Sequence, residues 1–98
     1  MASPSSQRRD VWFSGSVQGV GFRYTTRSIA RGYDVTGWVQ NLPDGRVKVA
    51  VEGEKAEVEA FLNEVSNRLG HFIRETREDV RPATGGFQDF DIHYGPSL

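Results

Sequence analysis

The sequence predicts an α+β fold in which two helices cover one face of an antiparallel sheet. Apolar and polar residues alternate in five short segments, which is the pattern of strands with one buried face. Two longer segments repeat their apolar residues with the helical period of three to four. Along the chain the order is strand, helix, strand, strand, helix and strand, with two candidates for the last strand.

The first strand and the first helix are joined by a glycine-containing segment. Alternating apolar residues predict a first strand within residues 11–17, and Gly15 lies at its exit. The helix is expected to begin at Phe22, and Gly32 supplies its stop. The apolar stripe of this helix consists of Phe22, Thr26, Ile29, Ala30 and Tyr33.

A hairpin and a second helix follow. Residues 35–39 alternate as a second strand, and a Pro-Asp-Gly turn leads to a third strand at residues 47–51. The strongest helical stripe of the chain comes next and ends at Gly70. Its members are Val58, Phe61, Leu62, Val65 and Leu69.

The last strand has two candidates. Residues 73–80 are highly charged and predict a strand only weakly, whereas Phe90, Ile92 and Tyr94 alternate clearly. One of the two is expected to be short or to lie at an edge. This order fits the split-βαβ, ferredoxin-like plan (βαββαβ), in which the third strand lies between the parallel first and second strands. The carboxyl ends of those two strands therefore meet at one edge of the sheet.

Residues 15–23, with the sequence Gly-Ser-Val-Gln-Gly-Val-Gly-Phe-Arg, predict an anion site. The glycines permit positive φ values and let a ligand approach the backbone of a helix N-terminus, where unpaired N–H groups and the dipole favour negative charge. Arg23 in the first helical turn opposes that dipole, which indicates a functional role. The alternative is a plain strand-to-helix turn with a solvated Arg23, because the loop is neither a dinucleotide fingerprint nor a Walker A loop.

Two stretches resemble the signatures of the acylphosphatase family. Residues 15–23 are similar to Gly-x-Val-Gln-Gly-Val-x-Phe-Arg, and residues 37–53 to a signature that starts Gly-aromatic-Val-x-Asn and closes with glycine. With a similar last strand, the resemblance covers residues 10–94. It implies the same fold and an acylphosphatase activity, in which Arg23 binds phosphate and Asn41 positions water. The segment 73–80 departs from the family pattern, because Thr76 and Glu78 stand where apolar residues are expected.

Hydrolysis of an acyl phosphate needs little beyond positioning and charge. The carboxylate leaving group departs without a proton donor, so the site has to hold the phosphoryl oxygens and aim a water in line. The Arg23 guanidinium offers a two-point grip, and Asn41 can orient the water by hydrogen bonding. The residues predicted to hold the phosphate are Gln18, Gly19, Val20, Gly21, Phe22 and Arg23.

Alternatives remain for single residues and for the whole chain. Asn41 is also typical of a residue that begins a turn, and Gln18 can stabilise the loop instead of touching substrate. The chain can instead be a non-catalytic phosphate- or metabolite-binding module, or an RNA-binding module on the same fold. RNA binding is disfavoured, because the third strand exposes no aromatic residue and Trp12 and Trp38 belong to strands that are not neighbours.

Composition narrows the remaining possibilities. The 98 residues are expected to form one acylphosphatase-like domain at 10–98, preceded by a flexible tail at 1–9. A net charge of −1 gives no reason to expect nucleic acid or a membrane as a partner, and the absence of cysteine excludes disulfides and thiolate sites. We therefore expect a cytoplasmic monomer that acts on a small-molecule acyl phosphate without metal or cofactor. His71 and His93 are expected to be surface residues.

Overall fold

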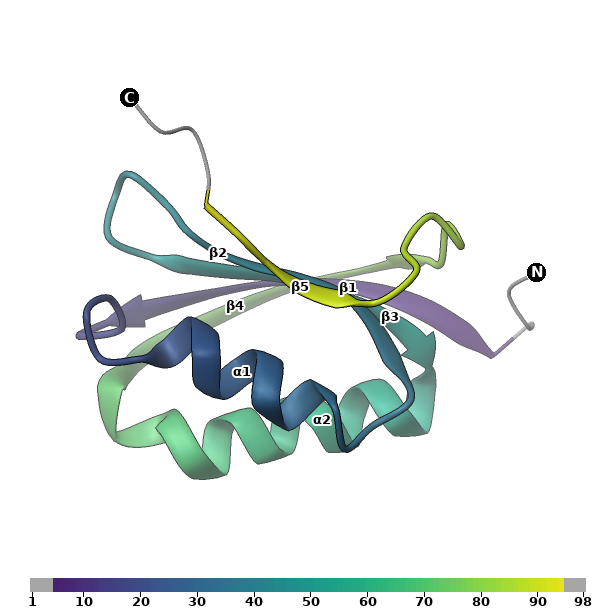
Figure 1. Cartoon of the computed structure of the whole chain (residues 1–98), viewed down its shortest axis with the longest axis horizontal. Coiled ribbons are helices and arrows are strands. Elements are labelled where there is room, and N and C mark those ends of the chain that lie inside the picture. The colour runs from purple at the N-terminus through teal and green to yellow at the C-terminus, as the bar shows by residue number, and fades with distance from the viewer. Residues whose placement is uncertain (1–4, 95–98) are drawn as a thin grey trace.

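The computed structural model describes residues 5–94, in which two helices lie on one face of a five-stranded sheet (Figure 1). Each helix follows a strand and returns the chain to the sheet, as crossover connections do. In chain order the elements are β1 (Ser6–Gly15), α1 (Phe22–Ala30), β2 (Val35–Asn41), β3 (Val47–Glu54), α2 (Lys55–Leu69), the 3₁₀ turn η1 (Gly70–Phe72), β4 (Ile73–Pro82) and β5 (Phe90–His93).

The strand order β4-β1-β3-β2-β5 confirms the predicted fold class. β3 lies antiparallel between β1 and β2, and β4 is antiparallel to β1, as the split-βαβ plan requires. The sheet is not antiparallel throughout, however, because β5 pairs in parallel with β2. Residues 83–89 reverse the chain after β4, so β5 runs in the direction of β1 and β2. Both candidates for the last strand are therefore strands, a long one at one edge and a short one at the other.

The core lies between the sheet and the two helices. Val11 and Phe13 of β1 pair with Val49 and Val47 of β3, and all four side chains are buried against the helices. Phe22 at the start of α1 packs on Phe13, with ring centroids 5.3 Å apart. The predicted apolar stripes are largely confirmed. The buried residues of the two helices are Phe22, Thr26, Ile29, Ala30, Val58, Phe61, Val65 and Leu69.

The predicted boundary of the N-terminal tail is wrong. Tail residues 6–9 belong to β1, which pairs with β3 from Ser6 and with β4 from Gln7. The prediction missed them because it followed apolar alternation, whereas backbone pairing holds this polar end of the strand. Its side chains are also fixed, since Arg8 binds Asp10 at 2.9 Å and Arg9 binds Glu59 at 3.0 Å. Residues 1–4 of the predicted tail lie outside the described residues.

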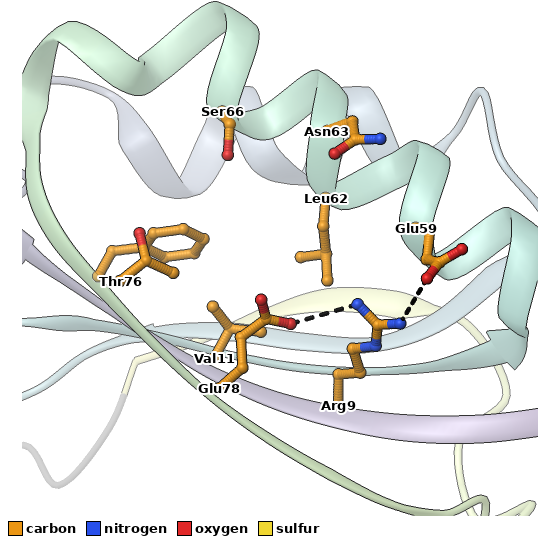
Figure 2. A pocket seen from close by; sticks show the side chains of 9 residues that line it. Arg9, Val11, Glu59, Leu62, Asn63, Ser66, Thr76 and Glu78 are labelled. Atoms are coloured by element: carbon orange, nitrogen blue, oxygen red, sulfur yellow. Dashed lines mark hydrogen bonds and ion pairs between the residues drawn. The ribbon is translucent and has the colours of Figure 1, made fainter.

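The charged segment at 73–80 forms a regular strand, and its polar residues explain a groove on the helix side. In β4, Thr76 lies opposite Phe13 and Glu78 lies opposite Val11, so both stand at positions that face the helices. Figure 2 shows these side chains below α2, with Arg9 between Glu78 and Glu59 at one end. A groove of about 360 Å³ remains between β4 and α2. Because an apolar strand would draw a helix closer, we attribute the groove to this polar face.

Candidate active site

The loop between β1 and α1 has the conformation that its glycines predict. Gly19 and Gly21 have φ angles of 77° and 78°, which side-chain-bearing residues rarely adopt. A Cβ atom on either glycine would meet nothing within 4 Å, so the space beside the backbone is open. Gly15 serves a different purpose, because its Cβ would lie 2.4 Å from the carbonyl oxygen of Phe72. Glycine is needed at this position because the backbone of Phe72 passes too close for a side chain, and not because a ligand binds there.

The N-terminus of α1 presents its backbone N–H groups without a competing side chain. Gly21 is the N-cap, no side chain caps the helix, and no acidic residue occupies the first turn. The first backbone hydrogen bond at this end runs from the N–H of Thr25 to the carbonyl of Gly21, at 3.0 Å. Among residues 5–94, the N–H groups of residues 19–23 donate to no protein acceptor. This is the arrangement that binds an anion at a helix start.

Arg23 extends from that first turn and packs on an aromatic ring. Its guanidinium carbon lies 5.2 Å from the ring centroid of Tyr94, and the hydroxyl of Tyr94 shares a hydrogen bond of 3.2 Å with that of Tyr24. This hydrogen bond raises the pKa of Tyr94. In the described part of the chain Arg23 has no acidic partner, so its charge is available to a ligand. Sequence reasoning assigned no role to Tyr24 or Tyr94. The only signal was that Tyr24 follows Arg23 and Tyr94 ends the last alternation.

Asn41 closes β2 and lies in the same pocket as Arg23. Its side-chain oxygen Oδ1 is buried and has no hydrogen-bond partner among the residues described. Such a buried acceptor is uncommon and costs free energy unless a ligand or water satisfies it. The pocket has a volume of about 130 Å³. It is lined by Val17, Gly19, Gly21, Phe22, Arg23, Tyr24 and Asn41.

The remaining predicted phosphate-binding residues have different positions. The side-chain amide of Gln18 donates to the carbonyls of Leu42 and Arg46, at 2.8 and 2.9 Å, so it ties the loop to the β2–β3 turn. Both amide hydrogens are used in this way, which supports the loop-stabilising interpretation. Val20 is 36% exposed and does not line the pocket. The Phe22 side chain is part of the core. Val20 and Phe22 can therefore offer a ligand only their backbone N–H groups.

The β2–β3 turn forms without the Asn41 side-chain oxygen. The N–H of Leu42 donates to the carbonyl of Arg46 at 2.8 Å, and the N–H of Gly45 to that of Leu42 at 3.1 Å. Asp44 accepts from the backbone and the guanidinium of Arg46, and these hydrogen bonds hold the pKa of Asp44 below its usual value. A turn-initiating Asn41 would be expected to accept a hydrogen bond from the turn through its side chain, and no such bond is present among the described residues.

The two histidines lie away from this pocket. Both are exposed: His71 packs on Phe72 beyond the end of α2, and His93 stacks on Trp38 at the sheet surface. The expectation that they are surface residues is confirmed. Within residues 5–94 no three histidine or carboxylate side chains come together as metal ligands. No helix in that range is both long enough and apolar enough to cross a membrane.

These observations first define a class: a split-βαβ domain that directs helix amides, an arginine and a buried amide oxygen into one small pocket suited to a phosphoryl group. Comparison with known proteins then identifies the family. The family model described as Acylphosphatase matches residues 9–92, and the chain belongs to that family of enzymes.

Relatives of similar length support this assignment. The acylphosphatase of Archaeoglobus fulgidus is 48% identical over 85 residues, which cover 87% of this chain and 96% of that protein. The acylphosphatase of a Synechococcus strain is 54% identical over 85 residues, covering 87% and 90%. Among solved structures, the acylphosphatase of Bacillus subtilis superposes with a TM-score of 0.81 at 29% identity, covering 90% of this chain and 99% of that one.

Proposed function

We propose that this chain hydrolyses the carboxyl–phosphate bond of small acyl phosphates to carboxylate and inorganic phosphate. The residues that line the pocket, as far as the chain is described, include no carboxylic acid or imidazole to serve as a general acid. A carboxylate leaves without a proton, whereas an alkoxide needs one. A pocket of this composition therefore suits an acyl phosphate better than an ordinary phosphomonoester.

The phosphoryl group is held from two directions in this proposal. The N–H groups of residues 19–23 donate to its oxygens at the positive end of α1, and the Arg23 guanidinium adds a bidentate grip. The ring of Tyr94 packs on Arg23 and supports the assignment. Because this contact already restricts Arg23 to few rotamers, the arginine loses less side-chain entropy when phosphate binds. These donors stabilise the negative charge that is spread over the phosphoryl oxygens in the transition state.

Asn41 positions the attacking water. Its Oδ1 accepts a hydrogen bond from the water while the oxygen of the water adds to phosphorus and the bond to the carboxylate oxygen breaks. One proton of the water stays on the attacking oxygen, and the other passes to a phosphoryl oxygen of the phosphate product. The carboxylate leaves with the electrons of the broken bond. The observation that carries the proposal is the buried, unpartnered Oδ1 of Asn41 in the pocket that Arg23 also lines, in the described part of the chain.

The proposal is tested by comparing two substrates in the presence of a metal chelator. Acetyl phosphate should be hydrolysed much faster than methyl phosphate, and the chelator should leave the rate unchanged, because neither a general acid nor a metal takes part. Equal rates on the two substrates would overturn the proposal. Loss of activity with the chelator would contradict its metal-free part.

We also propose that the enzyme is a cytoplasmic monomer without a cofactor. Sedimentation at the concentration used for the activity assay tests the oligomeric state, and a stable dimer would contradict a monomer. Cell fractionation tests the compartment.

A further inference from the structure

The sheet face opposite the helices carries a row of aromatic and basic side chains. Lys48 of β3 lies between the two tryptophans, with its ammonium nitrogen 4.8 Å from the ring centroid of Trp12 and 5.4 Å from that of Trp38. Trp38 stacks in turn on His93 of β5, with centroids 5.0 Å apart and an interplanar angle of 11°. The row therefore crosses β1, β3, β2 and β5. The β3 strand separates the tryptophans as predicted, but its lysine joins them into one surface.

One end of this row borders a hollow of about 250 Å³. Its lining consists of Trp12, Arg46, Arg77 and Asp79. Arg77 of β4 is the direct neighbour of Trp12 across the strands, and it has no acidic partner within residues 5–94. Asp79 is itself bound by Arg81 at 3.5 Å. The hollow thus offers an indole face and the guanidinium of Arg77, whereas the nearby Lys48 is paired with Asp10 at 3.8 Å.

The other half of the same sheet face is already covered. The segment after β4 folds back onto it, where Glu52 accepts hydrogen bonds from the N–H of Thr84 at 3.0 Å and from the N–H of Gly85 at 2.9 Å. In the same segment, the ring of Phe87 lies 5.5 Å from the Arg8 guanidinium carbon. The aromatic row lies at the half of the face that this segment leaves open. Trp12, Lys48 and Trp38 are half-buried, so part of each side chain is open to solvent.

We propose that this hollow binds a nucleoside monophosphate or a similar planar aromatic ring that carries one phosphate. The base stacks on the indole of Trp12, as bases stack on aromatic side chains, and the phosphate pairs with Arg77, because Lys48 is already held by Asp10 at 3.8 Å. The hollow is smaller than the roughly 300–1,000 Å³ of drug-sized pockets, which favours a single base. A polynucleotide fits less well, because the net charge is −1 and Asp79 lies beside the cations.

The chain offers a direct readout of this site. Both of its tryptophans, Trp12 and Trp38, lie in the row, so tryptophan fluorescence reports on this face alone. AMP should quench it saturably. Ribose 5-phosphate, which has no base, should not quench it, and adenosine, which has no phosphate, should bind about tenfold more weakly. Absence of quenching by AMP, or equal affinity for AMP and adenosine, would overturn the proposal.

Variants separate this site from the active site. Arg77→Gln should weaken AMP binding about tenfold without changing acyl phosphate hydrolysis, since a hydrogen bond to a charged group is lost. Arg74→Gln is the matched control on the same strand and should leave AMP binding unchanged. Arg23→Ala should also leave AMP binding unchanged. Loss of AMP binding in Arg23→Ala would place AMP in the active site, and much tighter binding of a short single-stranded RNA would assign the face to a polynucleotide. Either result would overturn the proposal.

Discussion

Two of the hollows on the helix side of the sheet differ in what their polar groups do. The groove between α2 and β4 is the larger, at about 360 Å³ against about 130 Å³ for the pocket at the start of α1. In the groove Arg9 is bound by Glu59 at 3.0 Å and by Glu78 at 3.3 Å. In the pocket Arg23 and the Asn41 oxygen have no such partners within the described chain. Between these two hollows, the candidate site is marked by its unpaired polar groups and not by its volume.

Loss of the unpaired cation should have the largest effect. If Arg23 holds the phosphoryl group in both ground and transition states, as proposed, Arg23→Ala should lower kcat/KM by at least about 10²–10³ and weaken the binding of inorganic phosphate. Thermal stability should change by no more than about 1 kcal/mol, since the lost contact with Tyr94 and the relieved helix dipole offset each other. Calorimetry with phosphate gives the affinity. Undiminished phosphate binding would show that Arg23 does not contribute to holding the phosphate.

Asn41→Ala should reduce turnover while leaving phosphate affinity intact. If Asn41 acts on the water, its effect is confined to the transition state, and kcat should fall on the order of 10²–10³. Steady-state kinetics together with phosphate calorimetry separates this outcome from that of Arg23→Ala. Wild-type turnover in a folded variant would contradict the assignment. A variant that unfolds would make Asn41 a structural turn residue instead.

The paired arginine of the groove should affect stability and not activity. Arg9→Met keeps the apolar stem but removes the ion pairs to Glu59 and Glu78, whose side chains are 45% and 42% exposed. Water can solvate these carboxylates, so the free energy of unfolding should fall by only about 1 kcal/mol. Urea denaturation measures it. Arg68→Met, which breaks an exposed pair within α2, is the matched control and should cost less than about 0.5 kcal/mol. A large loss of activity in Arg9→Met would mean that the groove contributes to catalysis, and it would contradict the distinction between the two hollows.

A change in the groove floor should have the smallest effect. Thr76→Val places a methyl group opposite Phe13 without changing the shape of the side chain, and it keeps a β-branched residue in β4. We expect the free energy of unfolding to rise by about 0.5 kcal/mol, because the added apolar surface is only partly buried. Urea denaturation tests this value as well. A decrease would mean that the threonine hydroxyl makes a contact that matters.

The sequence predicted the parts of the fold that follow from local pattern. The alternating valines of β3 and the glycines before Phe22 define elements whose geometry depends on nearby residues. The start of β1 was missed because polar strand residues are held by backbone pairing with distant strands. The parallel pairing of β5 depends on the path of residues 83–89, which leaves no periodic signal.

For the candidate site, the sequence predicted that Arg23 and Asn41 lie together, but not the partners that the neighbouring side chains take. Arg23 and Asn41 were placed at one sheet edge by topology alone, and the pocket brings them together. The two carbonyls that bind Gln18 belong to backbone 24 and 28 residues away, which no motif reveals. The packing of Tyr94 on Arg23 depends on β5 lying beside β2, so it could not be predicted either.

The hydrogen bonds of Gln18 also have a consequence for the order of events during folding. They join the loop to a hairpin turn across 24 and 28 residues, so the site does not exist until the hairpin has docked beside β1. Contacts of such sequence separation form late, because the entropy of closing the intervening chain opposes them. A refolding chain should therefore regain secondary structure before it regains activity. The recovery of enzyme activity therefore reports when the last step of folding is complete.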